Sequence, residues 1–343
     1  MTRASAQRRR AMAGGHRTVL ALLLLACALS SLVHAAALER GPVPGIVGTR
    51  FEYVVRKGDT LTAISARYAV SEKALIRDNA LRPPYLLKPG DRVHVHNRHL
   101  VPDGAPPDGI VINLPQRLLF VFRNGQVAAV YPVAAGKPDW QTPTGSYSAR
   151  TLQQDKAWIV PPSIQDEMRA QGKPVLTRVE PGPENPLGRY WIGLSLSGYG
   201  IHGTNAPGSI YYLRTHGCIR VHPEDIEALY GQMSLHMPVK IIYAHTLLAR
   251  LADGRILVEV NRDFYDRGGD PLQIIRDMAR QNGLDADIDW AAAQDVANAR
   301  IGQAFEIGRA GTQAAAPRGA AGVQTKMPAW GTAAQAATAS PYR

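Results

Sequence analysis

Cysteine is scarce in this chain: Cys27 and Cys218 are the only two among 343 residues. Phenylalanine is also rare, with five residues, whereas there are 32 glycines and 25 prolines. That balance indicates a loop-rich and strand-rich protein rather than a helical bundle. The length is sufficient for two or three small domains.

The N-terminus lacks both acidic residues and a long apolar run. The stretch "MTRASAQRRRAMAGGHR" carries five arginines and no acid, and "TVLALLLLACALSSLV" follows it. The apolar run is shorter than the roughly 20 residues that a membrane span needs. Residues 1–37 are therefore predicted to be a secretory signal, cleaved near Ala35 to Ala37. Lipoprotein processing at Cys27 is the less favoured alternative.

Cleavage at that point has two consequences. The formal charge falls from +11 to +6, because five positive charges leave. A modest basic excess suits an anionic surface such as a cell wall or lipid headgroups. Cys218 is left without an intramolecular partner, and a lone thiol in an oxidising compartment is a liability unless it is buried or used.

Residues 51–96 are predicted to form a very small domain with the order strand, helix, helix, strand. Phe51 to Val55 alternate as in a half-buried strand, and "KGD" makes the following turn. Asp59 or Thr60 can cap the first helix, and "LKPGDRVHV" supplies a proline-glycine turn and the closing strand.

The same residues resemble the LysM module. "YVVRKGDTLTAISARYAVSEKALIRDN", followed by "LKPGDRV", matches that family along nearly its whole length. The resemblance implies binding to N-acetylglucosamine-containing glycans such as peptidoglycan. It assigns the glycan groove to Gly58, Asp59, Thr60, Asn79 and Leu81. A βααβ domain that serves only as a spacer is the alternative.

The rest of the chain divides by composition. Residues 97–108 are a Pro/Gly-rich linker, expected to hold two domains apart. Residues 109–243 are mostly strand, with a hairpin at Asn124-Gly125, a long loop from Pro161 to Leu187 and a helix at "HPEDIEALYGQM". Residues 250–309 predict one strand and two helices, a short α+β extension. Residues 310–343 have almost no bulky side chains and are predicted to be disordered.

The stretch "IHGTNAPGSIYYLRTHGCIR" raises the question of catalysis. A catalytic thiol needs an imidazole to take its proton and backbone N–H groups aimed at an oxyanion. Cys218 has Gly217 beside it, His202 ends a predicted strand, and Arg220 can hold a carboxylate. Taken singly, each of these residues is more often structural. A zinc site is disfavoured because His216 and Cys218 are two apart in an extended segment.

In combination, "HGTN", a gap, "THGCIR" and "HPEDI" resemble the signature of the YkuD-type L,D-transpeptidases. The match runs from about residue 109 to 243 and includes the block "TPTG". The resemblance implies a mainly β chain with a β-sandwich catalytic domain, an N-terminal LysM domain and a C-terminal extension like that of Gram-negative periplasmic members. No cofactor, metal or nucleic acid is implied.

The resemblance also implies residue roles. Cys218 would be the nucleophile and His202 its general base, oriented by a carbonyl such as that of Gly203. The N–H groups of Gly217 and Cys218 would form the oxyanion hole. Residues expected to shape the substrate site are Thr215, His216, Arg220 and Tyr211. Tyr211 stands where relatives often have glycine, so it is expected to narrow the approach.

The implied reaction is acyl transfer on peptidoglycan. The thiolate attacks the carbonyl of the third stem residue and expels the terminal D-Ala, and an amine then takes the thioester. The amine belongs to another stem, giving a 3→3 crosslink, or to a lysine of an anchored lipoprotein. Water as acceptor would make the enzyme a carboxypeptidase, and a wall-binding protein without catalysis is a further alternative. Carbapenems are expected to acylate the cysteine.

Overall fold

The computed structural model describes residues 45–310 and 329–330. The chain divides into two units, Met1–Gly41 and Pro42–Arg343, and every described residue belongs to the second. The predicted signal segment, Cys27 and most of the predicted disordered tail therefore lie outside the described residues. No helix among the described residues is long and apolar enough to cross a membrane.

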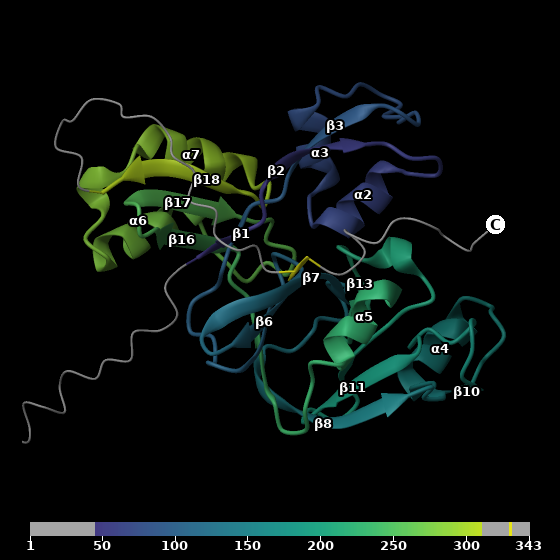
Figure 1. Ribbon diagram of the computed structural model, residues 1–343. Helices are drawn as coiled ribbons and strands as arrows, with labels where there is room; N and C mark the ends of the chain where they lie inside the picture. Colours follow the sequence, from purple (N-terminus) through teal and green to yellow (C-terminus); the bar gives the residue numbers. More distant parts are fainter. Residues whose placement is uncertain (1–44, 311–328, 331–343) are drawn as a thin grey trace, which may run out of the picture. The chain divides into compact units, whose positions relative to one another are not determined.

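The LysM-like segment folds as predicted. It comprises β2 (Arg50–Val54), α2 (Leu61–Tyr68), α3 (Glu72–Asp78) and β3 (Arg92–His96), with β2 and β3 antiparallel (Figure 1). Thr60 caps α2, since its hydroxyl accepts a hydrogen bond from the Ala63 amide at 3.0 Å. Ser71 caps α3 in the same way, bonding to the Ala74 amide.

A ten-stranded sheet forms the largest part of the fold. Its spatial order is β13-β7-β14-β12-β11-β8-β15-β5-β6, with the short strand β19 also paired to β7. The strands are β5 (Gly109–Asn113), β6 (Leu118–Arg123), β7 (Gln126–Gly136), β8 (Gly145–Gln154), β11 (Tyr190–Leu194), β12 (Gly200–His202), β13 (Leu213–Thr215), β14 (Ile219–Val221), β15 (Pro238–Ile242) and β19 (Ala329–Trp330).

The long strand β7 closes this sheet on itself. One part of β7 pairs with β6, and its far end pairs with β14 and β13. The predicted hairpin at Asn124-Gly125 is confirmed: Arg123 pairs with Gln126, and both turn residues have positive φ, at 50° and 71°. The mainly β prediction is confirmed, and the expected sandwich takes the form of a curved, closed sheet.

Strands β5 and β6 are buried on both faces, which explains their nearly continuous apolar sequence. Ile110 and Ile112 face the core enclosed by the sheet, whereas Val111 packs in a second cluster. Ala66 and Ala69 of the α2 region belong to that second cluster. The alternation along β5 therefore serves two cores rather than a core and solvent.

Two expectations about connecting segments are wrong. The linker does not hold its neighbours apart, because the Tyr212 hydroxyl donates to the Glu72 carboxylate of α3 at 2.7 Å. Within the linker, β4 (His99–Leu100) pairs with β1 (Ile46–Val47) and Leu100 is 1% exposed. The segment from Pro161 to Leu187 is not only loop. It contains α4 (Pro162–Ala170) and β10 (Arg178–Val179), which pairs with β9 (Trp158–Ile159). No residue of α4 is fully buried, but Ile164 and Met168 are four residues apart on one helix face and are partly buried.

The remaining elements follow the predicted order with two extra strands. Helix α5 (Pro223–Tyr230) follows β14, and η1 (Pro207–Ser209) precedes β13. The extension is a three-stranded sheet with two helices and a short 3₁₀ turn: β16 (Thr246–Arg250), β17 (Arg255–Val260), α6 (Pro271–Gln281), η2 (Asp285–Asp287), α7 (Trp290–Ala299) and β18 (Ala304–Arg309). Strands β16 and β18 were missed, and the α+β class is confirmed.

Candidate active site

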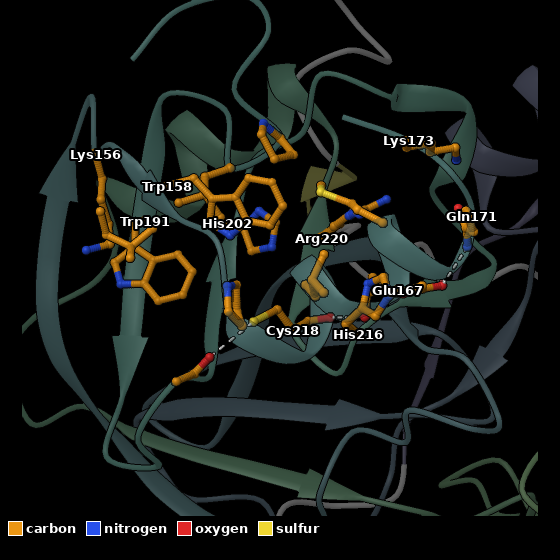
Figure 2. A pocket seen from close by; sticks show the side chains of 18 residues that line it. Lys156, Trp158, Glu167, Gln171, Lys173, Trp191, His202, His216, Cys218 and Arg220 are labelled. Carbon is orange, nitrogen blue, oxygen red and sulfur yellow. Dashed lines mark hydrogen bonds and ion pairs between the residues drawn. The ribbon is translucent and has the colours of Figure 1, made fainter. Parts of the chain in front are cut away.

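A cleft of about 750 Å³ contains most of the residues singled out in the motif (Figure 2). His202, Thr215, His216, Cys218 and Arg220 all contribute to its lining. The other lining residues come mainly from the segment around α4 and from β11: Lys156, Trp158, Ile159, Pro161, Ile164, Glu167, Met168, Gln171, Lys173, Pro186, Leu187, Trp191 and Gly198.

The pairing of β12 with β14 brings the cysteine and the histidine into this cleft. The two strands run parallel, with Ile201 opposite Ile219 and His202 opposite Arg220. Cys218 immediately precedes β14, so it lies diagonally across from His202 on the neighbouring strand. A separation of sixteen residues in the sequence therefore becomes proximity at the edge of one cleft.

The Cys218 thiol is held in its neutral form. Its Sγ donates to the carbonyl oxygen of Gly198 at 3.6 Å. Burial raises the pKa of the Cys218 thiol, although a backbone contact with Gly200 and the Arg220 charge act in the opposite direction. The structure thus shows a resting thiol rather than a thiolate.

The His202 ring is fixed in a tautomer that leaves Nε2 free to accept a proton. Its Nδ1 lies 2.6 Å from the carbonyl oxygen of Gly203, which requires the proton on Nδ1. Trp191 stacks on the ring, with centroids 5.7 Å apart and planes at 24°. Burial and the charge of Arg220 lower the pKa of His202 to about 4, so the imidazole is neutral at neutral pH.

Among the described residues, no hydrogen bond joins His202 to Cys218. The thiol donates instead to the Gly198 carbonyl. Hydrogen bonds between catalytic groups are often long or misaligned without substrate, so this geometry fits a resting site.

The loop before Cys218 is fastened by a threonine at each side. Thr215 Oγ1 donates to the Cys218 carbonyl at 2.6 Å and accepts from the Gly217 amide at 3.0 Å. Thr142, from the "TPTG" block, donates to the Gly217 carbonyl at 2.8 Å. Gly217 has φ of 107°, and a Cβ there would lie 2.7 Å from the Tyr199 ring. The expectation that the Gly217 amide is free for an oxyanion is not met, because Thr215 already occupies it.

Tyr211 is not in the cleft. It is 1% exposed and packs in the second core cluster, with the Arg117 guanidinium 4.0 Å from its ring centroid. The structure therefore does not bring this side chain to the approach that it was expected to narrow. Arg220 does line the cleft, where burial lowers the pKa of its guanidinium and its NH1 group contacts Ser209 Oγ at 3.4 Å.

The predicted glycan-binding residues lie just before the start of α2 and just after the end of α3. Three of them already form hydrogen bonds that stabilise the fold. Asp59 accepts hydrogen bonds from the Tyr53 hydroxyl at 2.6 Å and from a backbone amide. Thr60 caps α2, and Asn79 bonds to the backbone of His94 through both its amide atoms. Gly58 is exposed and Leu81 is partly exposed.

Sequence reasoning missed two groups of cleft residues. Glu167 on α4 forms hydrogen bonds with His216 Nε2 at 2.5 Å and with Lys137 Nζ at 3.2 Å. Both lower the pKa of the Glu167 carboxyl, and the hydrogen bond from His216 has the larger effect. Trp191 covers His202, and Lys156 Nζ lies 5.7 Å from the Trp191 ring centroid. Register along "YWIGLSLSGYGIHG" could have found Trp191, since it pairs with His202 across that hairpin. No local signal pointed to Glu167.

Replacing Glu167 with glutamine is expected to lower kcat/KM about tenfold, the loss expected for one charge-assisted hydrogen bond. Glu167 acts through His216 as a positioning residue and ties α4 to the wall of the cleft. The loss should therefore appear mainly as a higher KM, with kcat less affected. Asp166→Asn is the matched control, because Asp166 is exposed and pairs only with Arg169. Equal kcat/KM in the two variants would contradict this role.

Among the described residues, no group of three or more His, Cys, Asp or Glu side chains is arranged to hold a metal ion.

Comparison with known proteins places the two folded parts in families. The model described as the L,D-transpeptidase catalytic domain matches residues 107–241, and the LysM domain model matches residues 53–95. A probable L,D-transpeptidase, YcfS of Escherichia coli K12, is 30% identical over 269 residues, which cover 76% of this chain and 84% of that protein. The chain belongs to the L,D-transpeptidase family.

Two further similarities were found. A putative L,D-transpeptidase, YkuD of Bacillus subtilis 168, is 32% identical over 51% of this chain and 88% of that protein. The solved catalytic domain of the E. faecium L,D-transpeptidase is 24% identical over 40% of this chain and 100% of that one, with a TM-score of 0.32. The present chain is thus an enzyme of the L,D-transpeptidase class, and its two domains imply that it binds peptidoglycan and uses it as substrate.

Proposed function

We propose that Cys218 is the nucleophile of this L,D-transpeptidase and that His202 is its general base. The observation that carries the proposal is the neutral His202 ring, with its proton on Nδ1 bound to Gly203 and its Nε2 available, in the same cleft as Cys218. A neutral imidazole base accepts the thiol proton as the sulfur attacks, so no ion pair between thiolate and imidazolium has to form beforehand.

The first half-reaction makes a thioester. Cys218 Sγ attacks the carbonyl carbon of the third stem residue while its proton passes to His202. The Cys218 amide donates a hydrogen bond to the tetrahedral oxyanion. The Gly217 amide can donate a second one only after its hydrogen bond to Thr215 Oγ1 breaks. The C–N bond then breaks, and the imidazolium protonates the departing D-Ala amine.

The second half-reaction releases the acyl group. An acceptor amine attacks the thioester carbonyl, gives its proton to His202, and the C–S bond breaks to restore the thiol. The acceptor is the side-chain amine of another stem, or a lysine of an outer-membrane lipoprotein. Hydrolysis of the same thioester is the second candidate function.

The charges of the cleft suit a stem peptide that carries carboxylates. Lys156, Lys173 and Arg220 line it, while its one lining carboxylate, Glu167, is bonded to His216 and Lys137. Arg220 is the residue best placed to hold a stem carboxylate near the reacting carbonyl, since it lies on β14 two residues after the thiol.

The domain plan and location belong to the same proposal. Residues 51–96 hold the glycan strand, through Gly58 to Thr60 and Asn79 to Leu81, while residues 109–243 process the stem. Members of the family act on the cell wall, and the chain therefore works outside the cytoplasm. Residues 1–37 would direct it to the periplasm of a Gram-negative bacterium.

Product analysis tests the proposed function. The purified enzyme is incubated with disaccharide-tetrapeptide, and the products are resolved by mass spectrometry. Crosslinked dimer with loss of D-Ala is expected. Tripeptide without dimer would instead identify a carboxypeptidase. Absence of turnover, with binding to sacculi retained, would identify a wall-binding protein and overturn the catalytic assignment.

A further inference from the structure

A second cavity, of about 290 Å³, lies away from the cysteine cleft and is lined by three parts of the chain. Its lining residues are Ser65, Ser71, Glu72 and Lys73 from the LysM-like part; Arg117, Tyr211 and Tyr212 from the catalytic part; and Asn261, Arg262, Phe264, Arg300, Ile301 and Gly302 from the extension. The proposed transpeptidase mechanism uses no residue of this cavity, although Tyr211 and Tyr212 belong to the motif segment.

The cavity is strongly cationic. Lys73, Arg117, Arg262 and Arg300 line it, against one carboxylate, Glu72. The Glu72 Oε1 atom already accepts hydrogen bonds from the hydroxyls of Thr62 and Tyr212, at 2.6 and 2.7 Å. Across residues 45–310, none of the four basic side chains forms an ion pair.

Arg117 is the only one of these four basic residues that is buried, so its charge has the greatest need of a counter-ion. It is 9% exposed, and its guanidinium lies between the rings of Tyr211 and Phe264, 4.0 and 5.1 Å from their centroids. Its NH1 group donates to the Tyr211 carbonyl at 2.9 Å, but its Nε atom has no partner. A buried guanidinium without a counter-ion is costly, so a charge of opposite sign in the cavity would stabilise it.

The buried carboxylate of Glu259 does not supply that charge. Its two oxygens accept hydrogen bonds from the His99 ring, the Leu100 amide, Gln116 and Asn261, at 2.7 to 3.1 Å. Glu259 is therefore saturated by its own donors and forms no ion pair with Arg117.

Three buried polar atoms of the lining residues form no hydrogen bond within the described part of the chain, and their chemistry suits an oxyanion. Arg117 Nε and the Tyr211 hydroxyl are donors, and Asn261 Oδ1 is an acceptor, because the Asn261 amide nitrogen donates to Glu259. Two donors suit the oxygens of an anion, and one acceptor suits an O–H on the same group. A protonated phosphate-type oxyanion has both.

We propose that this cavity binds a phosphate-type oxyanion, either the free ion or the terminal phosphate of a monoester. Tyr211 and Tyr212 lead directly into β13, and β13 ends at Thr215, which fastens the loop of Gly217 and Cys218. An anion bound to Tyr211 would therefore also hold the segment that carries the cysteine. Tyr211, which the motif places where relatives often have glycine, would then bind the anion in the second cavity rather than substrate in the cleft.

Titration of the full-length enzyme in phosphate-free buffer tests the site. Inorganic phosphate is added in one series and glycerol 3-phosphate in another, with calorimetry and thermal unfolding as readouts. Saturable binding and a rise in Tm are expected, and the tighter of the two probes identifies the free ion or the monoester as the source.

Tyr211→Phe is the decisive variant, because it removes only a hydroxyl without a partner. Without anion its Tm should not fall, whereas its affinity for phosphate should drop about tenfold with the loss of one charge-assisted hydrogen bond. The double variant Lys73→Ala/Arg300→Ala, at the exposed rim, should bind still more weakly. Arg250→Ala, an exposed arginine elsewhere on the extension, is the control and should bind as the wild type does. Absence of saturable binding, or equal affinity in the wild type and Tyr211→Phe, would overturn the proposal.

Discussion

The variant Cys218→Ala should lose at least about 10³-fold in transpeptidation, because no other thiol lies in the cleft and the thioester cannot form. The protein should fold normally, since the thiol's contacts are weak ones with the backbone, such as the 3.6 Å contact with the Gly198 carbonyl. A carbapenem should add its mass to the wild type and not to this variant. Product assays and intact-protein mass spectrometry provide the measurements.

Two controls separate loss of chemistry from loss of structure. Ser197→Ala changes an exposed side chain in the turn beside Gly198 and should retain the wild-type rate. Cys218→Ala itself should bind sacculi as strongly as the wild type, because glycan binding is assigned to residues 51–96. Full activity in Cys218→Ala would refute the nucleophile and with it the proposed mechanism.

The variant His202→Gln should lose between about 10² and 10⁴-fold in kcat/KM, the usual contribution of a positioned general base. The pH dependence distinguishes a base from a merely structural ring. In the wild type the base is neutral above its pKa of about 4, so activity should be lost only as the pH falls through that value. Without the imidazole, the reaction depends on free thiolate, whose pKa is raised by burial. The variant's rate should therefore rise tenfold per pH unit from pH 5 to 8.

His236→Asn is the control for this series. His236 is exposed, lies outside the cleft and has φ of 66°, a backbone conformation that asparagine tolerates. Its pH profile should match that of the wild type. A His202→Gln profile parallel to the wild type at every pH would show that the imidazole does not act as the base.

The position of the cleft could be predicted from the motif because the residues with catalytic chemistry lie within the twenty positions 201–220. Cys218, His202, His216 and Arg220 were all named from the sequence, and all line one cavity. The residues alone did not distinguish the two histidines, because nothing local states that β12 and β14 pair in parallel. The family resemblance supplied that choice, and the hydrogen bond from His202 to Gly203 gives it a physical basis.

Some features of the fold and the site could not be predicted from the sequence, mainly because they depend on contacts between residues far apart in the chain. Tyr211 looked like a cleft residue by position, yet its ring packs against Arg117, which is 94 residues away. Glu167 lies on a short helix with no fully buried residue, and no local signal showed that its carboxylate meets His216. Strand β18 was missed because its partner is β17, which lies some 45 to 54 residues earlier in the chain. Strand β16 was missed although it pairs locally, with β17 as its neighbour in a hairpin.

The contact between the Cys218 thiol and the Gly198 carbonyl has a consequence for durability. Peroxides and disulfides react with thiolates, and a thiol that stays protonated is attacked far more slowly. Burial raises the pKa of the Cys218 thiol, and the Gly198 carbonyl accepts its hydrogen bond, so both favour the protonated sulfur. In the extracytoplasmic location that we propose, this protonation would protect the cysteine without a disulfide.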